Sequence, residues 1–117
     1  IVPKALEIGP RLLNTFTTAY KFGIKIAFGT DSGVSYHGDN AKEFYYMVKG
    51  GMSEMEAIRS ATVVASEMLK INDKYGTIES NKVADIIAVE GNPIKDITSL
   101  QKVVFVMKDG EIYKNLN

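Results

Sequence analysis

Ile24-Lys25-Ile26-Ala27-Phe28-Gly29-Thr30-Asp31-Ser32-Gly33 is the most informative stretch of the sequence. Residues 24–28 are a short β-prone run, and residues 30–39 are rich in Gly, Ser and Asp, as loops are. Before the run, residues 3–22 have the spacing of a helix, and Gly23 is a natural stop for it. A helix, a glycine and an apolar strand in this order are typical of an α/β unit with a largely buried strand.

The rest of the first half of the sequence carries signals for where helices start and stop. Pro10 lies inside the first helical stretch, so we expect a kink there or two helices. Residues 40–43 have capping-box spacing before a helix that Gly50-Gly51 closes. Residues 53–56 repeat that spacing and open another helix. This last helix carries a narrow apolar stripe made of Ile58, Ala61, Ala65 and Met68.

The second half is β-rich. Val83–Val89 and Val103–Met107 are runs that predict strands, and Asp109-Gly110 is a strong hairpin signal before residues 111–113. We therefore expect an α/β part over residues 1–70 and a β-rich part over residues 71–117. A chain of 117 residues is long enough for one modest core.

Composition excludes several classes of function. Lys+Arg and Asp+Glu both number 14, so no net field favours nucleic acid or an anionic membrane. The chain has no Cys, hence no disulfide or thiolate metal site, and no apolar run long enough to span a bilayer. It begins with Ile1-Val2-Pro3, as we expect for a piece of a longer polypeptide. Missing targeting signals therefore leave the compartment open, with the cytoplasm favoured.

Asp31 is the principal candidate for chemistry. In α/β folds ligands bind beyond the carboxyl ends of strands, where Asp31 falls. A carboxylate there can coordinate a metal ion and exchange a proton with metal-bound water. The alternative is structural: loop aspartates often form an Asx-turn or cap a helix, and spacing alone favours that role.

His37 is the sole histidine, so a histidine-rich metal site must draw on residues outside this chain. The sequence fits three roles for His37 equally: metal ligand, substrate contact or hydrogen-bonding loop residue. The role of a hydrogen-bonding loop residue is the commonest. The sequence does not match the other catalytic motifs considered. Ser32 is one position off the spacing of a nucleophile elbow, and the glycines lack the Lys-Ser/Thr pair of a phosphate loop.

Several motifs, in this order, resemble the end of the catalytic barrel in the amidohydrolase superfamily, nearest to its imidazolonepropionase-like and Xaa-Pro dipeptidase-like hydrolases. The matching stretches are residues 23–33, His37-Gly38-Asp39-Asn40 with Glu43, residues 51–58 with Ala61-Thr62, Tyr75-Gly76-Thr77-Ile78-Glu79, residues 82–89, Asn92-Pro93 and residues 106–110. One departure concerns a turn: the family usually has Pro-Gly-Lys where this chain has Ser80-Asn81-Lys82.

The resemblance implies a fold and a role for each site residue. Residues 24–28 would be the eighth strand of a (β/α)8 barrel whose C-terminal part covers residues 1–70, and residues 71–117 would be strands of a small accessory β-sandwich. Asp31 would ligate the first metal and carry a proton from the attacking water to the leaving nitrogen. Tyr36 and His37, in the loop after that strand, would contact substrate.

The implied activity is hydrolysis of a C–N bond, in an amide or a dipeptide-like substrate, with Xaa-Pro one candidate. The complete protein would use one or two divalent metal ions, zinc being expected. The family's His-x-His, its bridging lysine or glutamate and its other histidines are missing here, so we expect this chain alone to be inactive and to hold no metal tightly.

The expected partners are a small-molecule substrate, the remainder of the barrel and further copies of the chain. The alternative function is a non-catalytic scaffold fragment that self-associates through exposed strand edges.

Overall fold

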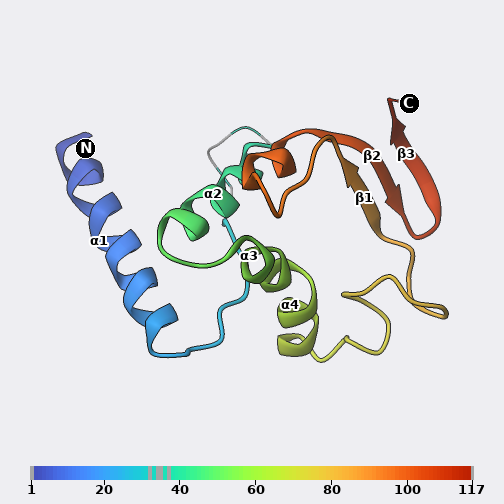
Figure 1. Cartoon of the computed structure of the whole chain (residues 1–117), viewed down its shortest axis with the longest axis horizontal. Helices are drawn as coiled ribbons and strands as arrows, with labels where there is room; N and C mark the ends of the chain where they lie inside the picture. Colours follow the sequence, from blue (N-terminus) through green and yellow to red (C-terminus); the bar gives the residue numbers. More distant parts are fainter. Residues whose placement is uncertain (1, 32, 34–35, 37, 117) are drawn as a thin grey trace.

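The computed structural model describes residues 2–31, 33, 36 and 38–116, of which residues 2–8 are described by their backbone. Figure 1 shows α1 at one end of the molecule and the sheet at the other, with the remaining helices between them. In chain order the elements are α1 (Val2–Lys21), the 3₁₀ helix η1 (Asp39–Ala41), α2 (Lys42–Lys49), α3 (Glu54–Ala61), α4 (Val63–Met68), β1 (Ile86–Val89), the 3₁₀ helix η2 (Ile97–Gln101), β2 (Val103–Lys108) and β3 (Glu111–Asn115). None of the described helices has the length and apolar character needed to cross a membrane.

The predicted glycine stops of two helices are confirmed. Gly23 after α1 and Gly51 after α2 have φ of 76° and 112°, the left-handed conformation that glycine adopts at little cost. At the end of α2, the Met52 N–H donates to the Met47 carbonyl at 3.1 Å and the Gly51 N–H donates to the Val48 carbonyl at 3.0 Å. This pair of bonds is the Schellman motif, and it satisfies carbonyls that the helix itself leaves unpaired.

Two predictions about helix boundaries are wrong in part. The helix is not split at Pro10: α1 continues from Val2 to Lys21, because losing one backbone hydrogen bond leaves the turns on either side intact. Asn40 does not cap α2. The N-cap is Ala41, whose side chain has no polar atom, and the 3₁₀ turn η1 before it provides backbone acceptors for the Lys42 N–H.

The helix predicted from residue 53 onward is interrupted at Thr62. Its start is as expected, since the Ser53 hydroxyl accepts a hydrogen bond from the Glu56 N–H at 3.2 Å. The helix then ends at Ala61, and α4 begins at Val63. Thr62 has φ −123° and ψ −88°, outside helical geometry, and it opens a run of β-branched residues, which favour helices least among aliphatic side chains.

The strand predicted over residues 24–28 is not formed within the described residues. A strand requires a neighbour to complete its ladder of hydrogen bonds, and no described segment pairs with this one. Residues 24–28 make a backbone hydrogen bond back to the end of α1. Apart from that bond, their recorded backbone contact is from the Phe28 N–H to the Ser60 carbonyl, at 2.9 Å. Ser60 lies in the last turn of α3, whose carbonyls have no partner within the helix. The break at Thr62 therefore leaves an acceptor for Phe28.

The three-stranded sheet is antiparallel, in the order β1-β2-β3. Asp109 and Gly110 have φ of 50° and 80°, the two positive values that a type I′ hairpin turn requires, so the predicted hairpin is confirmed. The Asp109 N–H also donates to the Asp85 carboxylate at 2.8 Å, which fixes the turn beside β1. The predicted strand Val83–Val89 is shorter than expected, because pairing begins at Ile86.

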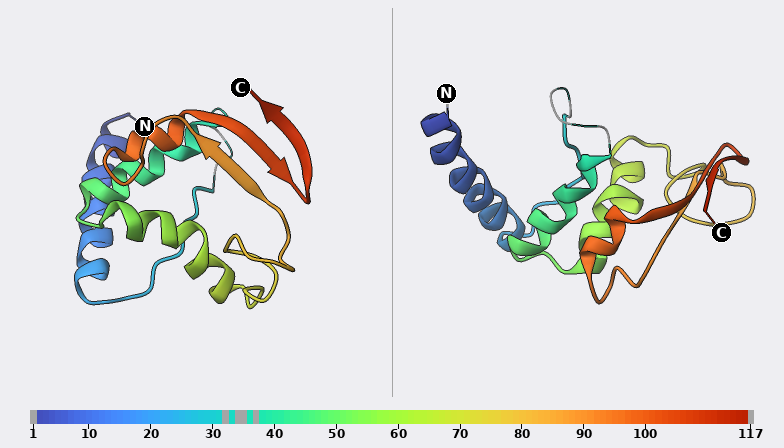
Figure 2. Two further views of the ribbon diagram at one scale, coloured as in Figure 1. Left: turned by 45° about the vertical axis from the view of Figure 1, so that its right-hand side comes forward. Right: turned by 90° about the horizontal axis from the view of Figure 1, so that it is seen from above.

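The core lies where α1, α2, α3 and η2 meet. Figures 1 and 2 show α2 and α3 between α1 and the sheet. The buried hydrophobic residues are Met47, Met52, Ala57 and Ile97. Partly buried side chains packed against them include Phe16, Tyr20, Ile26, Phe28, Phe44, Val48, Ile58 and Leu100. The segment before Asp31 therefore contributes two side chains to the same core as the helices.

Gly50 is the contact point between α1 and the end of α2. The Thr17 hydroxyl donates to the Gly50 carbonyl at 2.7 Å, and a Cβ atom at Gly50 would lie 2.6 Å from Cδ1 of Phe16. Gly50 has an ordinary φ of −77°, so it is space and not backbone conformation that requires glycine. The helix α1 can approach α2 this closely because residue 50 has no side chain.

We expect Gly50→Ala to lower the free energy of unfolding by about 1–3 kcal/mol, the usual cost of overpacking, because the Phe16 ring must move. Thermal or urea unfolding measures this change. Gly9→Ala is the matched control, since nothing lies within 4 Å of a Cβ there and alanine favours a helix. Equal stability of the two variants would show that α1 does not pack at Gly50.

Candidate functional site

Asp31 lies at the end of the segment that the core anchors, where the chain enters the loop to η1. Its φ of 47° is in the left-handed region, which aspartate tolerates better than most residues. The side chain is exposed and, within the described residues, makes no hydrogen bond or ion pair. In particular it forms no Asx-turn with the Gly33 N–H. The recorded cap positions of the neighbouring helices are Gly38 and Ala41. Among the residues that the structure describes, neither structural alternative for Asp31 is therefore found.

A stacked pair of aromatic rings closes the base of the loop that carries Asp31. The Phe28 and Phe44 ring centroids lie 4.4 Å apart, with 22° between the planes. Phe28 precedes the loop, and Phe44 lies on α2, after it. Both ends of the loop are thereby joined by one contact. No sequence pattern indicates this pair, because nothing local relates two apolar residues on either side of a loop.

Of the other predicted site residues, the structure describes Tyr36 but not His37. Tyr36 is 85% exposed, and its carbonyl accepts a hydrogen bond from the Asp39 N–H at 3.1 Å. Asp39 also pairs with Lys42 at 3.6 Å. His37 lies outside the described residues, so its predicted roles stay predictions. The structure records no contact between Tyr36 and Asp31 in the part of the chain that it describes.

The described residues contain no cluster of three or more His, Asp or Glu side chains arranged to hold a metal ion. Asp31 contributes oxygen atoms, which suit hard or borderline divalent cations. The Asp31 carboxylate has no partner among the described residues that would compete with such a cation. The described part of this chain thus fits a metal ion with one ligand, and a full ligand set would need further residues.

Two of the cavities that described residues line lie elsewhere. One, of about 580 Å³, is between α4, the loop after it and the start of β1; among the residues lining it are Ile58, Ala61 and Ala65 of the predicted apolar stripe. Met68, the remaining member of that stripe, is 56% exposed. The other cavity, of about 630 Å³, lies between α1 and α2. Asp31 lines neither cavity.

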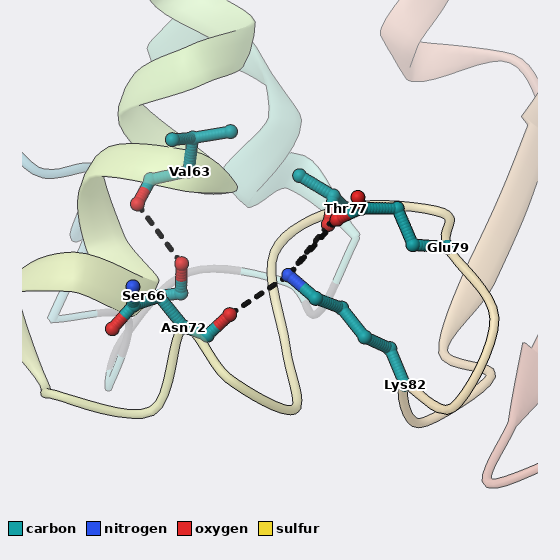
Figure 3. A network of polar contacts seen from close by, with 6 residues as sticks. All are labelled: Val63, Ser66, Asn72, Thr77, Glu79 and Lys82. Atoms are coloured by element: carbon teal, nitrogen blue, oxygen red, sulfur yellow. Dashed lines mark hydrogen bonds and ion pairs between the residues drawn. The ribbon is translucent and has the colours of Figure 1, made fainter.

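Lys82 organises the loop that connects α4 to the sheet (Figure 3). Its ammonium group donates to the Asn72 carbonyl at 2.8 Å and to the Thr77 hydroxyl at 2.7 Å, and it lies 3.2 Å from the Glu79 carboxylate. The Thr77 hydroxyl in turn donates to Glu79. The Lys82 side chain is only 16% exposed, and these acceptors compensate the burial of its charge.

The turn before Lys82 explains the departure from the family pattern at residues 80–82. The Lys82 N–H donates to the Glu79 carbonyl at 3.3 Å, and Asn81 has a φ of 71°. A β-turn with a positive φ at its third residue is of type II, which favours Gly or Asn there and Pro before it. Ser80-Asn81 therefore serves the same turn as Pro-Gly, as predicted.

Comparison with known proteins defines the family. Residues 2–113 match the sequence profile of the amidohydrolase family. The chain is 36% identical over 109 residues to the ochratoxinase of Aspergillus niger, an alignment that covers 87% of this chain and 22% of that enzyme. This chain belongs to the amidohydrolase family, as its motifs predict.

Solved structures agree with this assignment. A Xaa-Pro dipeptidase with methionine bound in its active site is similar with a TM-score of 0.90 and 56% identity, over 97% of this chain and 28% of that chain. A prolidase in complex with N-methylphosphonate-L-proline has a TM-score of 0.79 and 28% identity, over 88% of this chain and 26% of that chain. The chain therefore spans 22–28% of the length of these relatives. An α/β fold with helices and a small antiparallel sheet is confirmed.

The network around Lys82 makes a prediction about pH. The hydrogen bond from Thr77, and then the hydrogen bond and charge of Lys82, hold the pKa of Glu79 below its ordinary value of 4.5. A carboxyl whose pKa is lower in the folded state stabilises the fold above its unfolded pKa, and this contribution disappears as pH falls through the folded pKa. We expect Glu79→Gln to reduce stability at neutral pH, and the deficit to close below pH 4.5.

Thermal unfolding of the wild type and of Glu79→Gln across this pH range measures the effect. Glu90→Gln, at the exposed turn after β1, is the control and should follow the wild type throughout. A Glu79→Gln deficit that is absent at neutral pH, or that persists unchanged in acid, would contradict the prediction.

Proposed function

We propose that this chain is the C-terminal part of a metal-dependent amidohydrolase that cleaves a C–N bond in an amide or dipeptide-like substrate. Family membership and the 56% identity to a Xaa-Pro dipeptidase over 97% of the chain support this proposal. The observation that carries it is Asp31: a carboxylate just beyond a core-anchored segment, without a partner among the described residues. Among such substrates we propose a dipeptide with an Xaa-Pro bond first.

The proposed fold is a (β/α)8 barrel completed by the rest of the polypeptide, with residues 71–117 belonging to an accessory β-sandwich. Residues 24–28 would be its last strand. Two features support this: α1 precedes the segment, and the segment has no ladder partner among the described residues. A barrel strand needs neighbours on both sides, so the missing partners would be supplied by the remaining strands.

Asp31 would act twice in the proposed reaction, as a metal ligand and as a proton carrier. A catalytic zinc site takes three protein ligands as a rule, so Asp31 would hold one or two divalent ions, zinc first, together with ligands from the rest of the polypeptide. When bound, such an ion activates water and polarises the carbonyl group. The Asp31 carboxylate would accept the proton of the attacking water and then donate it to the leaving nitrogen.

The loop after the segment would face the substrate. Active sites of (β/α)8 barrels lie at the carboxyl ends of the strands, where the following loops contribute side chains. We propose Tyr36 and His37 as substrate contacts. The 85% exposure of the Tyr36 side chain supports this proposal for Tyr36, because that ring is free to pack against a ligand.

We expect Asp31→Asn in the complete polypeptide to lower kcat by roughly 10²–10⁴-fold, the usual contribution of a positioned acid–base group. Asparagine tolerates the left-handed backbone of residue 31, so the midpoint of thermal unfolding without metal should stay unchanged. Steady-state kinetics on a panel of dipeptides and elemental analysis of bound metal measure the two effects.

Asp39→Asn provides the matched control. It changes another exposed aspartate near the same loop, one that pairs with Lys42, and it should leave kcat and metal content at wild-type levels. Wild-type turnover in Asp31→Asn with its metal retained would remove Asp31 from the proposed role.

A further inference from the structure

We infer that the 3₁₀ helix η2 positions Tyr36 for substrate binding, through its contact with η1. The inference rests on the proposed function, because it takes Tyr36 to be a substrate contact. In the sequence η2 is far from Tyr36, since it lies in the connection between β1 and β2. Its role is to hold the backbone on which Tyr36 stands, and its own residues do not touch the substrate.

The first step of the inference is that η2 packs against the elements that follow the loop of Tyr36. It contacts both η1 and α2. Figures 1 and 2 show this short orange helix beside α2. Ile97 of η2 is 6% exposed and lies in the core with Met47 of α2, and Leu100 packs against the same core. Burial of apolar side chains therefore joins the connection between two strands to the helices.

The second step is that η2 has a shape set by its own hydrogen bonds. The Glu90 N–H donates to the Lys102 carbonyl at 2.9 Å, which closes the base of the connection between β1 and β2. The Asp96 carboxylate caps η2, because it accepts the Thr98 N–H at 3.0 Å and the Thr98 hydroxyl at 2.6 Å. These bonds join residues of the connection to one another, so they do not depend on other parts of the polypeptide.

The third step is that η1 holds the backbone at Tyr36. The N–H of Asp39, the first residue of η1, donates to the Tyr36 carbonyl at 3.1 Å. Within η1, Asp39 and Asn40 are exposed and Ala41 is half-buried, so Ala41 marks the inner side of this turn. Only residues 37 and 38 separate Tyr36 from η1 in the chain. A shift of η1 would therefore also shift the backbone that carries the Tyr36 ring.

The arrangement of η2 and the helices is compatible with a longer polypeptide. The Xaa-Pro dipeptidase to which this chain is similar with a TM-score of 0.90 is a chain of which this one covers 28%. That chain has the same overall arrangement of these elements with the remainder of its polypeptide present. The contacts of η2 with α2 and η1 are thus contacts that a complete enzyme can keep.

We expect Asp96→Ala in the complete polypeptide to raise KM for a dipeptide substrate by roughly two- to tenfold, the range that one aromatic contact gives. Because Tyr36 has no part in proton transfer, kcat should stay within about twofold of the wild type. Asp96→Asn and Asp96→Ser keep an oxygen that can cap η2, so they should restore KM to near the wild-type value. Steady-state kinetics on dipeptides, Xaa-Pro among them, measure both constants.

Gly110→Ala is the matched control. It strains the turn between β2 and β3, where φ is 80°, at the opposite end of β2 from η2. It should lower the thermal midpoint and leave KM and kcat unchanged. A rise in KM as large as that of Asp96→Ala would show that any loosening of the sheet has this effect, and it would overturn the inference.

Tyr36→Ala tests whether η2 acts through Tyr36. The double variant Asp96→Ala/Tyr36→Ala should have a KM no higher than that of Tyr36→Ala alone, because both changes remove the same substrate contact. Independent effects that multiply in the double variant would overturn the inference. If Asp96→Ala is poorly folded, Thr98→Val is the second variant: it removes the hydroxyl bond to Asp96, keeps the volume and should also raise KM.

Asp31→Asn in the same assay separates the two proposals. If Asp31→Asn is inactive and Asp96→Ala has the wild-type KM, the positioning role of η2 fails and the proposed hydrolase function stands. If Tyr36→Ala has the wild-type KM, Tyr36 is no substrate contact and the positioning role fails with it. If Asp31→Asn keeps wild-type turnover, the proposed function itself fails, and the role of η2 in it as well.

Discussion

The hydrogen bond from the Phe28 N–H to the Ser60 carbonyl connects the segment before Asp31 to helix α3. The segment has the composition of a buried strand but no strand beside it among the described residues, and its Phe28 N–H pairs with a helix carbonyl instead. Ser60 provides one because α3 ends at Ala61, which leaves the carbonyls of its last turn unpaired. The interruption at Thr62 and the position of the segment are therefore parts of one arrangement.

Apolar packing holds the segment before Asp31 in addition to this single hydrogen bond. Ile26 and Phe28 pack against the core that α1, α2, α3 and η2 form, and Phe44 stacks on Phe28 from the far side of the loop. Gly50 permits the close approach of α1 to the same core. Asp31 lies three residues after Phe28, exposed and without a partner among the described residues.

Features determined by local chemistry were predictable from the sequence. The glycines after α1 and α2 and the Asp109-Gly110 turn each need a positive φ, which few residues accept, and all of these stops and turns are found. The prediction of two helices at Pro10 was wrong, the helix predicted from residue 53 is interrupted at Thr62, and residues 24–28 form no strand among the described residues. For the site, the sequence located Asp31 at the end of its segment, but it gave no sign of the Phe28–Phe44 stack or of the contacts of Lys82. Those contacts join residues far apart in the chain or in an irregular loop, where no periodic pattern exists to indicate them.

The most direct test is a crystal structure of the complete polypeptide with its divalent metal, the metal located by anomalous scattering. We predict an Asp31 carboxylate oxygen at about 2.0–2.2 Å from the ion, the usual distance for a carboxylate on zinc. The same map would show residues 24–28 paired with a strand on each side. A metal ion bound elsewhere, with the Asp31 carboxylate facing solvent and remote from the substrate cleft, would contradict the central claim.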